Sequence, residues 1–221
     1  MLTLSTDLAL RIIARRAARF GVGYVLPDDV RRLAVVALVA LGHHVQGTGV
    51  TYEHVRDGVT LTLPGLPTAA GELLARVPVV GAELEAIARQ EGRTTVYLSP
   101  AAMADGAGLL ATWWHEEGHC GAIAAGGLPY CLTYLLAPEL RAAGEAPCYG
   151  AGMAVAVALG AALADVVAQA KLSLDHYGLG VEPYALACGL IDDAARSIAA
   201  GDFGGIEAEL RAELAAEGVS L

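Results

Sequence analysis

Two long stretches without a charged residue limit most strongly how this chain can fold. Residues 120–138 and 146–164 contain no Asp, Glu, Lys or Arg, and each approaches the length of a membrane span. A Gly-Gly pair and Pro129 interrupt the first stretch, and the second is rich in Ala and Gly rather than Leu and Ile, so neither resembles a strongly inserting span. We therefore expect both stretches to be buried inside a globular domain, without a membrane partner.

The composition favours packed helices and excludes one class of partner. Apolar residues make up 55% of the chain and aromatic residues only 5%, with Ala, Leu, Val and Gly dominant, which favours helices over a β-sandwich. A net charge of -10 leaves too little positive charge to neutralise a row of phosphates, so we expect no nucleic-acid partner. The one concentration of basic residues is predicted to be a solvated helix face; it comprises Arg11, Arg15, Arg16 and Arg19.

Hydrophobic periodicity and turn signals predict a mostly helical α+β fold with a small β-sheet in the N-terminal half. We expect a single domain over residues 1–221, with helices and the sheet in residues 1–100 and helices that carry the functional site in residues 101–221. Asp105 is placed to cap a helix that Gly126-Gly127 would end. The predicted helices cover residues 7–20, 27–44, 69–76, 81–90, 106–125, 147–174, 183–200 and 204–217, and the predicted strands cover residues 51–55, 59–63 and 94–98.

Cysteine usage and the start of the chain favour a cytoplasmic protein with reduced thiols. The four cysteines form no CxxC pair, which argues against a structural zinc knuckle. The first 20 residues have their arginines after the apolar residues, an order that does not fit a secretory signal. Whether any of the cysteines are bonded stays open; they are Cys120, Cys131, Cys148 and Cys188.

The sequence His115-Glu116-Glu117-Gly118-His119 carries the clearest chemical signal. Histidines four residues apart on a helix project from the same face, one turn apart, so two neutral imidazoles can bind one metal ion at ~2.0–2.1 Å. Glu116 lies one position further round, where its carboxylate can accept a proton from a water molecule that the metal activates. Glu117 points away from this cluster, and Gly118 either leaves space beside the metal or permits close helix packing.

This segment resembles the HExxH signature of the zincin metallopeptidases. The resemblance covers one helix and the strand before it, and it implies that His115 and His119 bind Zn²⁺ while Glu116 is the general base. It also implies a zincin-like domain that hydrolyses a peptide or protein substrate. The extension that supplies a third histidine in metzincins is absent, because residues 120–124 are Cys-Gly-Ala-Ile-Ala. Nothing else in the chain identifies a closer family.

A third protein ligand is needed if one position on the metal is to stay open for water. Zincins of the glutamate type supply a Glu from a later helix, and Glu145 lies 26 positions after His119, where a helix is predicted to start. Glu145 could instead be an acidic residue that is favoured at the start of a helix by the helix dipole, without any role in metal binding. The alternatives left open are Glu139, Asp175, His176, Asp192 and Asp193.

An oxyanion stabiliser is also expected, and Tyr149, His176 and Tyr177 are candidates, although each could be a packing residue. The main hypothesis is a cytoplasmic zinc metallopeptidase. One alternative is a membrane-embedded zinc peptidase that uses the two uncharged stretches. Others are a zinc hydrolase with a non-peptide substrate and a non-catalytic helical binding protein in which the motif is accidental or inactive. The oligomeric state stays open.

Overall fold

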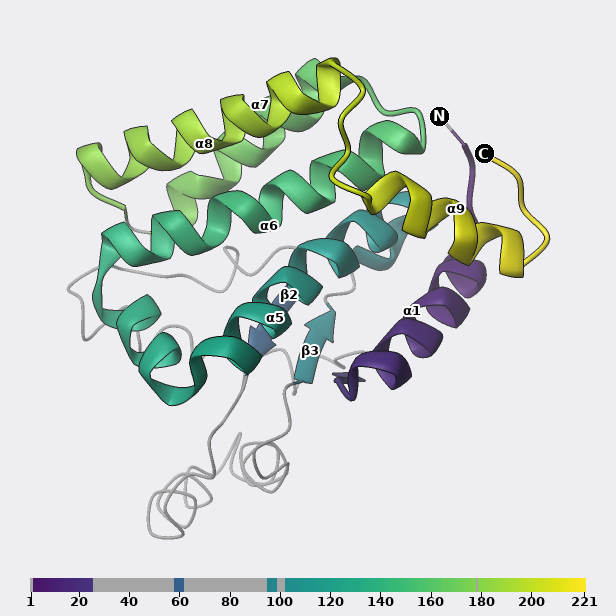
Figure 1. The fold of residues 1–221 in the computed structure, drawn as a ribbon, viewed down its shortest axis with the longest axis horizontal. Coiled ribbons are helices and arrows are strands. Elements are labelled where there is room, and N and C mark those ends of the chain that lie inside the picture. Colours follow the sequence, from purple (N-terminus) through teal and green to yellow (C-terminus); the bar gives the residue numbers. More distant parts are fainter. Residues whose placement is uncertain (1, 26–57, 62–94, 99–101, 178) are drawn as a thin grey trace, which may run out of the picture.

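The fold was analysed in a computed structural model that describes residues 2–25, 58–61, 95–98, 102–177 and 179–221. Within these ranges the protein is mostly helical, as predicted, and a small sheet comes from the first 98 residues (Figure 1). The helices are α1 (Thr6–Phe20), α5 (Gly106–Leu136), α6 (Pro138–Ala158), α7 (Leu163–Leu174), α8 (Val181–Ala199) and α9 (Ile206–Ala216). Two short 3₁₀ helices, η2 (Ala102–Ala104) and η3 (Asp175–Tyr177), precede α5 and follow α7.

The sheet has the strand order β1-β3-β2, comprising β1 (Gly23–Val25), β2 (Gly58–Leu61) and β3 (Thr95–Leu98). The central strand β3 pairs parallel with β1 and antiparallel with β2. The predicted strands over residues 59–63 and 94–98 correspond to β2 and β3. The predicted strand at residues 51–55 and the helices at 27–44, 69–76 and 81–90 lie outside the described residues.

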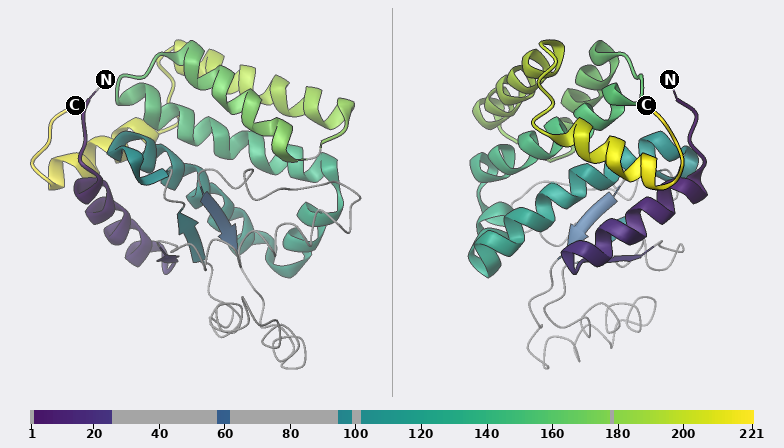
Figure 2. Two further views of the ribbon diagram at one scale, coloured as in Figure 1. Left: turned by 180° about the vertical axis from the view of Figure 1, so that it is seen from behind. Right: turned by 45° about the vertical axis from the view of Figure 1, so that its right-hand side comes forward.

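Two hydrophobic cores share α6, which lies between them (Figures 1 and 2). The first core joins α1, β3, α5 and α9 to the end of α6, and Trp113, Leu109 and Leu110 of α5 are almost wholly buried in it. The second core joins α6 to α7 and α8, where Ala187 and Ile191 of α8 are fully buried. Because α6 belongs to both cores, its position relative to α5 is fixed from two sides.

The start of α5 agrees with the sequence prediction, but its end does not. One side-chain oxygen of Asp105 accepts hydrogen bonds from the backbone N–H groups of Ala107 and Gly108 at 2.8 and 3.1 Å, which caps the helix. The helix then continues through Gly126-Gly127 to Leu136. The prediction that this glycine pair ends the helix was therefore wrong.

Instead of ending, α5 bends. His119 and Tyr134 are 15 residues apart, about 22 Å along a straight helix, yet their ring centroids are 5.9 Å apart. A Cβ on Gly126 would lie 2.5 Å from the Cβ of Tyr130, so the bend needs glycine there. Pro129 also removes a backbone N–H from the helix. The last part of α5 turns back towards the beginning of α6 (Figure 1).

The single helix predicted over residues 147–174 was also wrong, because α6 begins earlier and a break separates it from α7. The first residue of α6 is Pro138, a position that tolerates proline since the N–H there is unpaired in any helix. Pro147 therefore lies inside α6 and does not begin it. Gly160, at φ 93°, ends this helix in the left-handed conformation, with its N–H donating to Val157 O at 2.8 Å.

The arginine-rich face of α1 is solvated at Arg11, Arg15 and Arg19, as predicted, but not at Arg16. Arg16 is almost fully buried, its guanidinium lies 3.9 Å from the centroid of the Trp114 ring, and its Nη2 bonds Glu209 of α9 at 2.9 Å. The other arginines also pair with α9: Arg15 and Arg19 bond Glu213 at 2.7 and 2.8 Å, and Arg11 bonds Glu217 at 2.8 Å. Acidic residues at the C-terminal end of the chain thus pair with this basic face, while only Arg16 is buried.

The uncharged stretches lie in α5, α6 and the start of α7. Among the described residues, no helix is both long enough and apolar enough to cross a bilayer.

Candidate metal centre

The two faces of α5 around the HEEGH segment have different roles. His115 and His119 point towards α6 and are buried, with about a tenth or less of each residue exposed. On the other face, Glu117 accepts a hydrogen bond from Trp113 Nε1 at 2.8 Å and two from Arg16 of α1, at 2.8 and 2.5 Å. The two glutamates of the motif therefore have different surroundings, and Glu117 is a structural residue that anchors α5 to α1.

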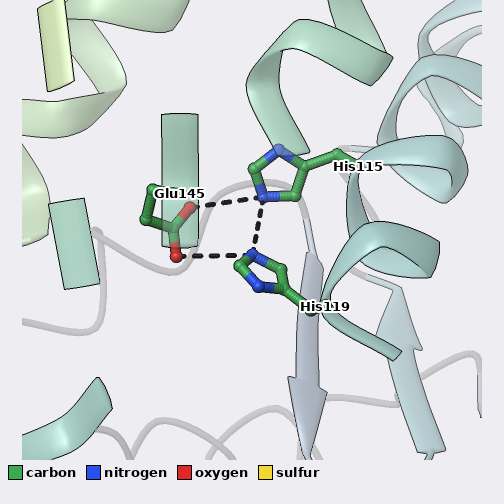
Figure 3. A group of neighbouring side chains, drawn as sticks. All are labelled: His115, His119 and Glu145. Atoms are coloured by element: carbon green, nitrogen blue, oxygen red, sulfur yellow. Dashed lines mark hydrogen bonds and ion pairs between the residues drawn. The ribbon is translucent and has the colours of Figure 1, made fainter. Parts of the chain in front are cut away.

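Glu145 of α6 reaches both histidines (Figure 3). Its Oε1 lies 3.3 Å from Nε2 of His119, its Oε2 lies 3.4 Å from Nε2 of His115, and the two imidazole nitrogens are 3.2 Å apart. Glu145 is 1% exposed, which places a carboxylate in the protein interior. The helix that carries it starts at Pro138, so Glu145 is two turns inside α6 and is not the helix-start residue that the sequence indicated.

The spacing of these three groups suits a metal ion. Four donors arranged tetrahedrally at ~2.0–2.1 Å from a centre are about 3.3 Å from one another, close to the three observed separations. Oε2 of Glu145 is buried, and its contact with Nε2 of His115 is long, at 3.4 Å, so a cation would add a close partner for this oxygen. His115, His119 and Glu145 form the one group of three potential ligands that converge in the described part of the chain, and they could hold a metal ion.

Without a metal ion, charge within the cluster is balanced by protons. Burial lowers the pKa of His119, but the charge of Glu145 and the interactions with Cys148 and Glu145 together outweigh burial and raise this pKa well above its ordinary value. Burial alone raises the pKa of Glu145, but the charge of His119 and the contacts with both histidines lower this pKa below its usual range. The buried cluster therefore pairs an imidazolium with a carboxylate, and a divalent cation would replace the proton on His119.

Tyrosines surround the cluster. Tyr134, at the returning end of α5, donates its hydroxyl hydrogen to Oε1 of Glu145. Tyr149, one turn after Glu145 on α6, packs its ring against His115 with centroids 4.5 Å apart and donates to the hydroxyl of Tyr177 at 3.3 Å. Burial, followed by the charge of Glu145, raises the pKa of all three phenols, so they remain protonated donors.

Glu116, the predicted general base, is 4% exposed and lies among the groups around the cluster. Its negative charge contributes to the raised pKa of Cys148 and of Tyr149, although burial is the larger cause in each. Cys148 lies on α6 three residues after Glu145, and its thiol donates to the carbonyl oxygen of Gly144 at 3.2 Å. Burial raises the pKa of this thiol, while the interaction with His119 opposes that rise. Cys120, Cys148 and Cys188 are free thiols.

The helices α5 and α6 meet closely beside the donors. A Cβ on Gly118 would lie 2.9 Å from Sγ of Cys148, and a Cβ on Gly152 would lie 3.0 Å from the carbonyl oxygen of Ala111. The space at Gly118 is therefore used for helix packing, one of the two roles considered from sequence.

Four of the other candidates for the third ligand lie outside the cluster. Glu139 and Asp175 are exposed, Asp192 pairs with Lys171 at 2.6 Å, and Asp193 pairs with Arg196. The side chain of His176 lies outside the described residues. Of the candidates for an oxyanion stabiliser, Tyr149 borders the cluster directly, and Tyr177 contacts it through Tyr149.

Sequence reasoning missed Tyr134 and Arg141. The predicted end of the helix at Gly126-Gly127 left Tyr134 in an irregular connection, with no reason to place it near His119. The spacing of Arg141, Glu145 and Tyr149, each four residues after the last, is a signal that was available, because it places all three on one face of a helix.

Comparison of the chain with protein-family models, with curated proteins and with solved structures finds no match.

Proposed function

We propose that this protein is a zinc-dependent hydrolase that cleaves peptide bonds. The observation that carries the proposal is the convergence of His115, His119 and Glu145 on one buried point with separations of 3.2–3.4 Å. Two imidazoles and one carboxylate form a donor set typical of catalytic zinc, in which three protein ligands leave a position for water or substrate. The choice of zinc and of a peptide substrate follows from the resemblance of HEEGH to the zincin signature.

Each residue then has a defined task. The imidazoles of His115 and His119 and the carboxylate of Glu145 hold the ion. At this site a zinc ion would supply a Lewis acid for polarising a carbonyl group and lowering the pKa of water. Glu116 accepts the proton that the attacking water loses and delivers it to the leaving amine. The buried position of Glu116 strengthens its electrostatic interactions relative to those of a carboxylate in water.

Four purified proteins test the proposal: the wild type and the variants Glu116→Gln, His115→Ala and Glu139→Gln. We expect the wild type to contain about one zinc ion per chain and to cleave casein or a peptide library. Glu116→Gln should retain the metal and lose cleavage by at least about 100-fold, because general-base catalysis contributes about 10²–10⁴. His115→Ala should lose both metal and cleavage. Metal content is measured by elemental analysis and cleavage by peptide mass spectrometry.

Glu139→Gln is the matched control, since it makes the same chemical change at an exposed position of α6. It should retain zinc and activity. A wild type that binds no zinc after purification without chelator would disprove the metal site. A zinc-loaded wild type that cleaves no peptide, but hydrolyses another substrate class in a screen, would retain the hydrolase and reject the peptidase.

A further inference from the structure

The carboxylate of Glu145 is itself held by residues that the HEEGH motif does not include. Oε1 of Glu145 accepts a hydrogen bond from the hydroxyl of Tyr134, while Oε2 has no such partner. The two oxygens therefore differ: one is fixed by a phenol, and the other faces His115 at 3.4 Å. A hydrogen bond to Oε1 restricts the rotation of the carboxylate, which keeps Oε1 directed towards His119 and Oε2 directed towards His115.

Tyr134 is held in place by its backbone as well as by its hydroxyl. Arg141, one turn before Glu145 on α6, donates from Nε to the carbonyl oxygen of Tyr134 at 3.1 Å and from Nη1 to the carbonyl oxygen of Tyr177. Arg141 is 2% exposed, so these bonds form in the interior. Arg141 and Glu145, four residues apart on α6, thus both bind Tyr134. Arg141 binds its backbone carbonyl oxygen, and Glu145 binds its hydroxyl group.

The bend in α5 is what makes this contact possible. A straight helix would carry Tyr134 about 22 Å from His119, too far away to contact Glu145. The bend at Gly126 instead brings the Tyr134 ring to 5.9 Å from the His119 ring. One helix therefore supplies two histidines and, after turning back, the hydroxyl that orients the third donor.

We propose that Tyr134 is a positioning residue that orients Glu145 for metal binding, with Arg141 fixing the backbone of Tyr134. This inference rests on the proposed function, because it concerns the affinity of the same site for zinc. Outer partners of metal ligands typically contribute about 10–100-fold to metal affinity. A phenol on a carboxylate ligand fits this role, since it orients the carboxylate without competing for the ion.

The test measures the dissociation constant for zinc, by competition with a chromophoric chelator, in the full chain and in point variants. Tyr134→Phe removes only the hydroxyl and should raise the dissociation constant about 10–100-fold. Tyr184→Phe is the matched control. It removes a hydroxyl that bonds the backbone carbonyl oxygen of Lys171 instead of a metal donor, and we expect a change of less than about 3-fold.

A double-mutant cycle separates orientation of Glu145 from a general effect on folding. In a Glu145→Ala background, Tyr134→Phe should weaken zinc binding by less than about 2-fold, because the oxygen on which the hydroxyl acts is gone. Equal weakening in both backgrounds would overturn the inference, and so would wild-type affinity in Tyr134→Phe. A wild type that binds no zinc would instead disprove the proposed function, and this inference with it.

Discussion

At the scale of single residues, Gly118 determines how closely the two helices that carry the donors can approach. A Cβ at this position would lie 2.9 Å from Sγ of Cys148 and 3.6 Å from its Cα, whereas a Cβ on Gly121 of the same helix would meet nothing within 4 Å. A side chain would therefore be crowded at Gly118 but would have open space at Gly121, three residues later. Gly118 is required by packing, and Gly121 lowers helix stability without a steric reason.

Gly118→Ala should destabilise the protein by about 1–3 kcal/mol, the usual cost of adding a methyl group to a close-packed contact. Gly121→Ala should stabilise it by about 0.5–1 kcal/mol, because alanine loses less conformational entropy in a helix. Urea denaturation of both variants measures the difference. Cys148→Ala should remove most of the penalty of Gly118→Ala. If both alanine variants were stabilising, this would disprove the claim that α5 and α6 are in close contact at Gly118.

At the scale of elements, α1 and α9 determine where the HEEGH turn of α5 lies. Arg16 bonds Glu117 within the motif and Glu209 of α9, and its guanidinium stacks on Trp114. One buried cation thus connects three helices, and the second acidic residue of the motif contributes to this connection rather than to the metal centre. Arg11, on the exposed side of α1, makes a single pair with Glu217.

Arg16→Ala should lower the free energy of unfolding by about 3–5 kcal/mol, because removing one partner of a buried ion pair leaves the other uncompensated. Arg11→Ala, the control on the same helix, should change it by less than about 1 kcal/mol, as is usual for exposed pairs. Denaturant titrations of the metal-free proteins compare the two. A similar, small effect at both positions would show that Arg16 does not anchor the motif.

At the scale of the whole molecule, a metal ion would join the two cores. His115 and His119 belong to α5 in the first core, and Glu145 belongs to α6, which contributes to both. A ligand that binds only the folded state stabilises it by mass action, so metal binding at this point should stabilise the entire fold and not only the site.

Zinc at 100 times its dissociation constant should stabilise the wild type by about 2.7 kcal/mol, and excess chelator should remove this contribution. For a chain of this size the melting temperature should fall by roughly 5–10 °C on chelation. Differential scanning calorimetry of the wild type and of His115→Ala tests this, since the variant should not respond to chelator. A chelator-insensitive wild type would favour the alternative in which HEEGH is accidental.

The sequence by itself determined those features that depend on residues close together in the chain. These are the mostly helical class, the Asp105 cap, the segment that forms β3, and the presence of His115 and His119 on one helical face, because a helix fixes neighbours three and four residues apart. Glu145 was selected among several acids by resemblance to zincins, without a physical reason to exclude the others.

Only the tertiary structure decided which segments that are distant in the sequence contact one another. Whether Gly126-Gly127 ends or bends α5 depends on the packing of Tyr130 and Tyr134 against α6, and local preference at a glycine pair is compatible with both outcomes. The burial of Arg16 depends on α9, almost 200 residues away. The approach of Glu145 to both histidines, and of Tyr134 to Glu145, follows from the contact of two helices, which no spacing within either helix encodes.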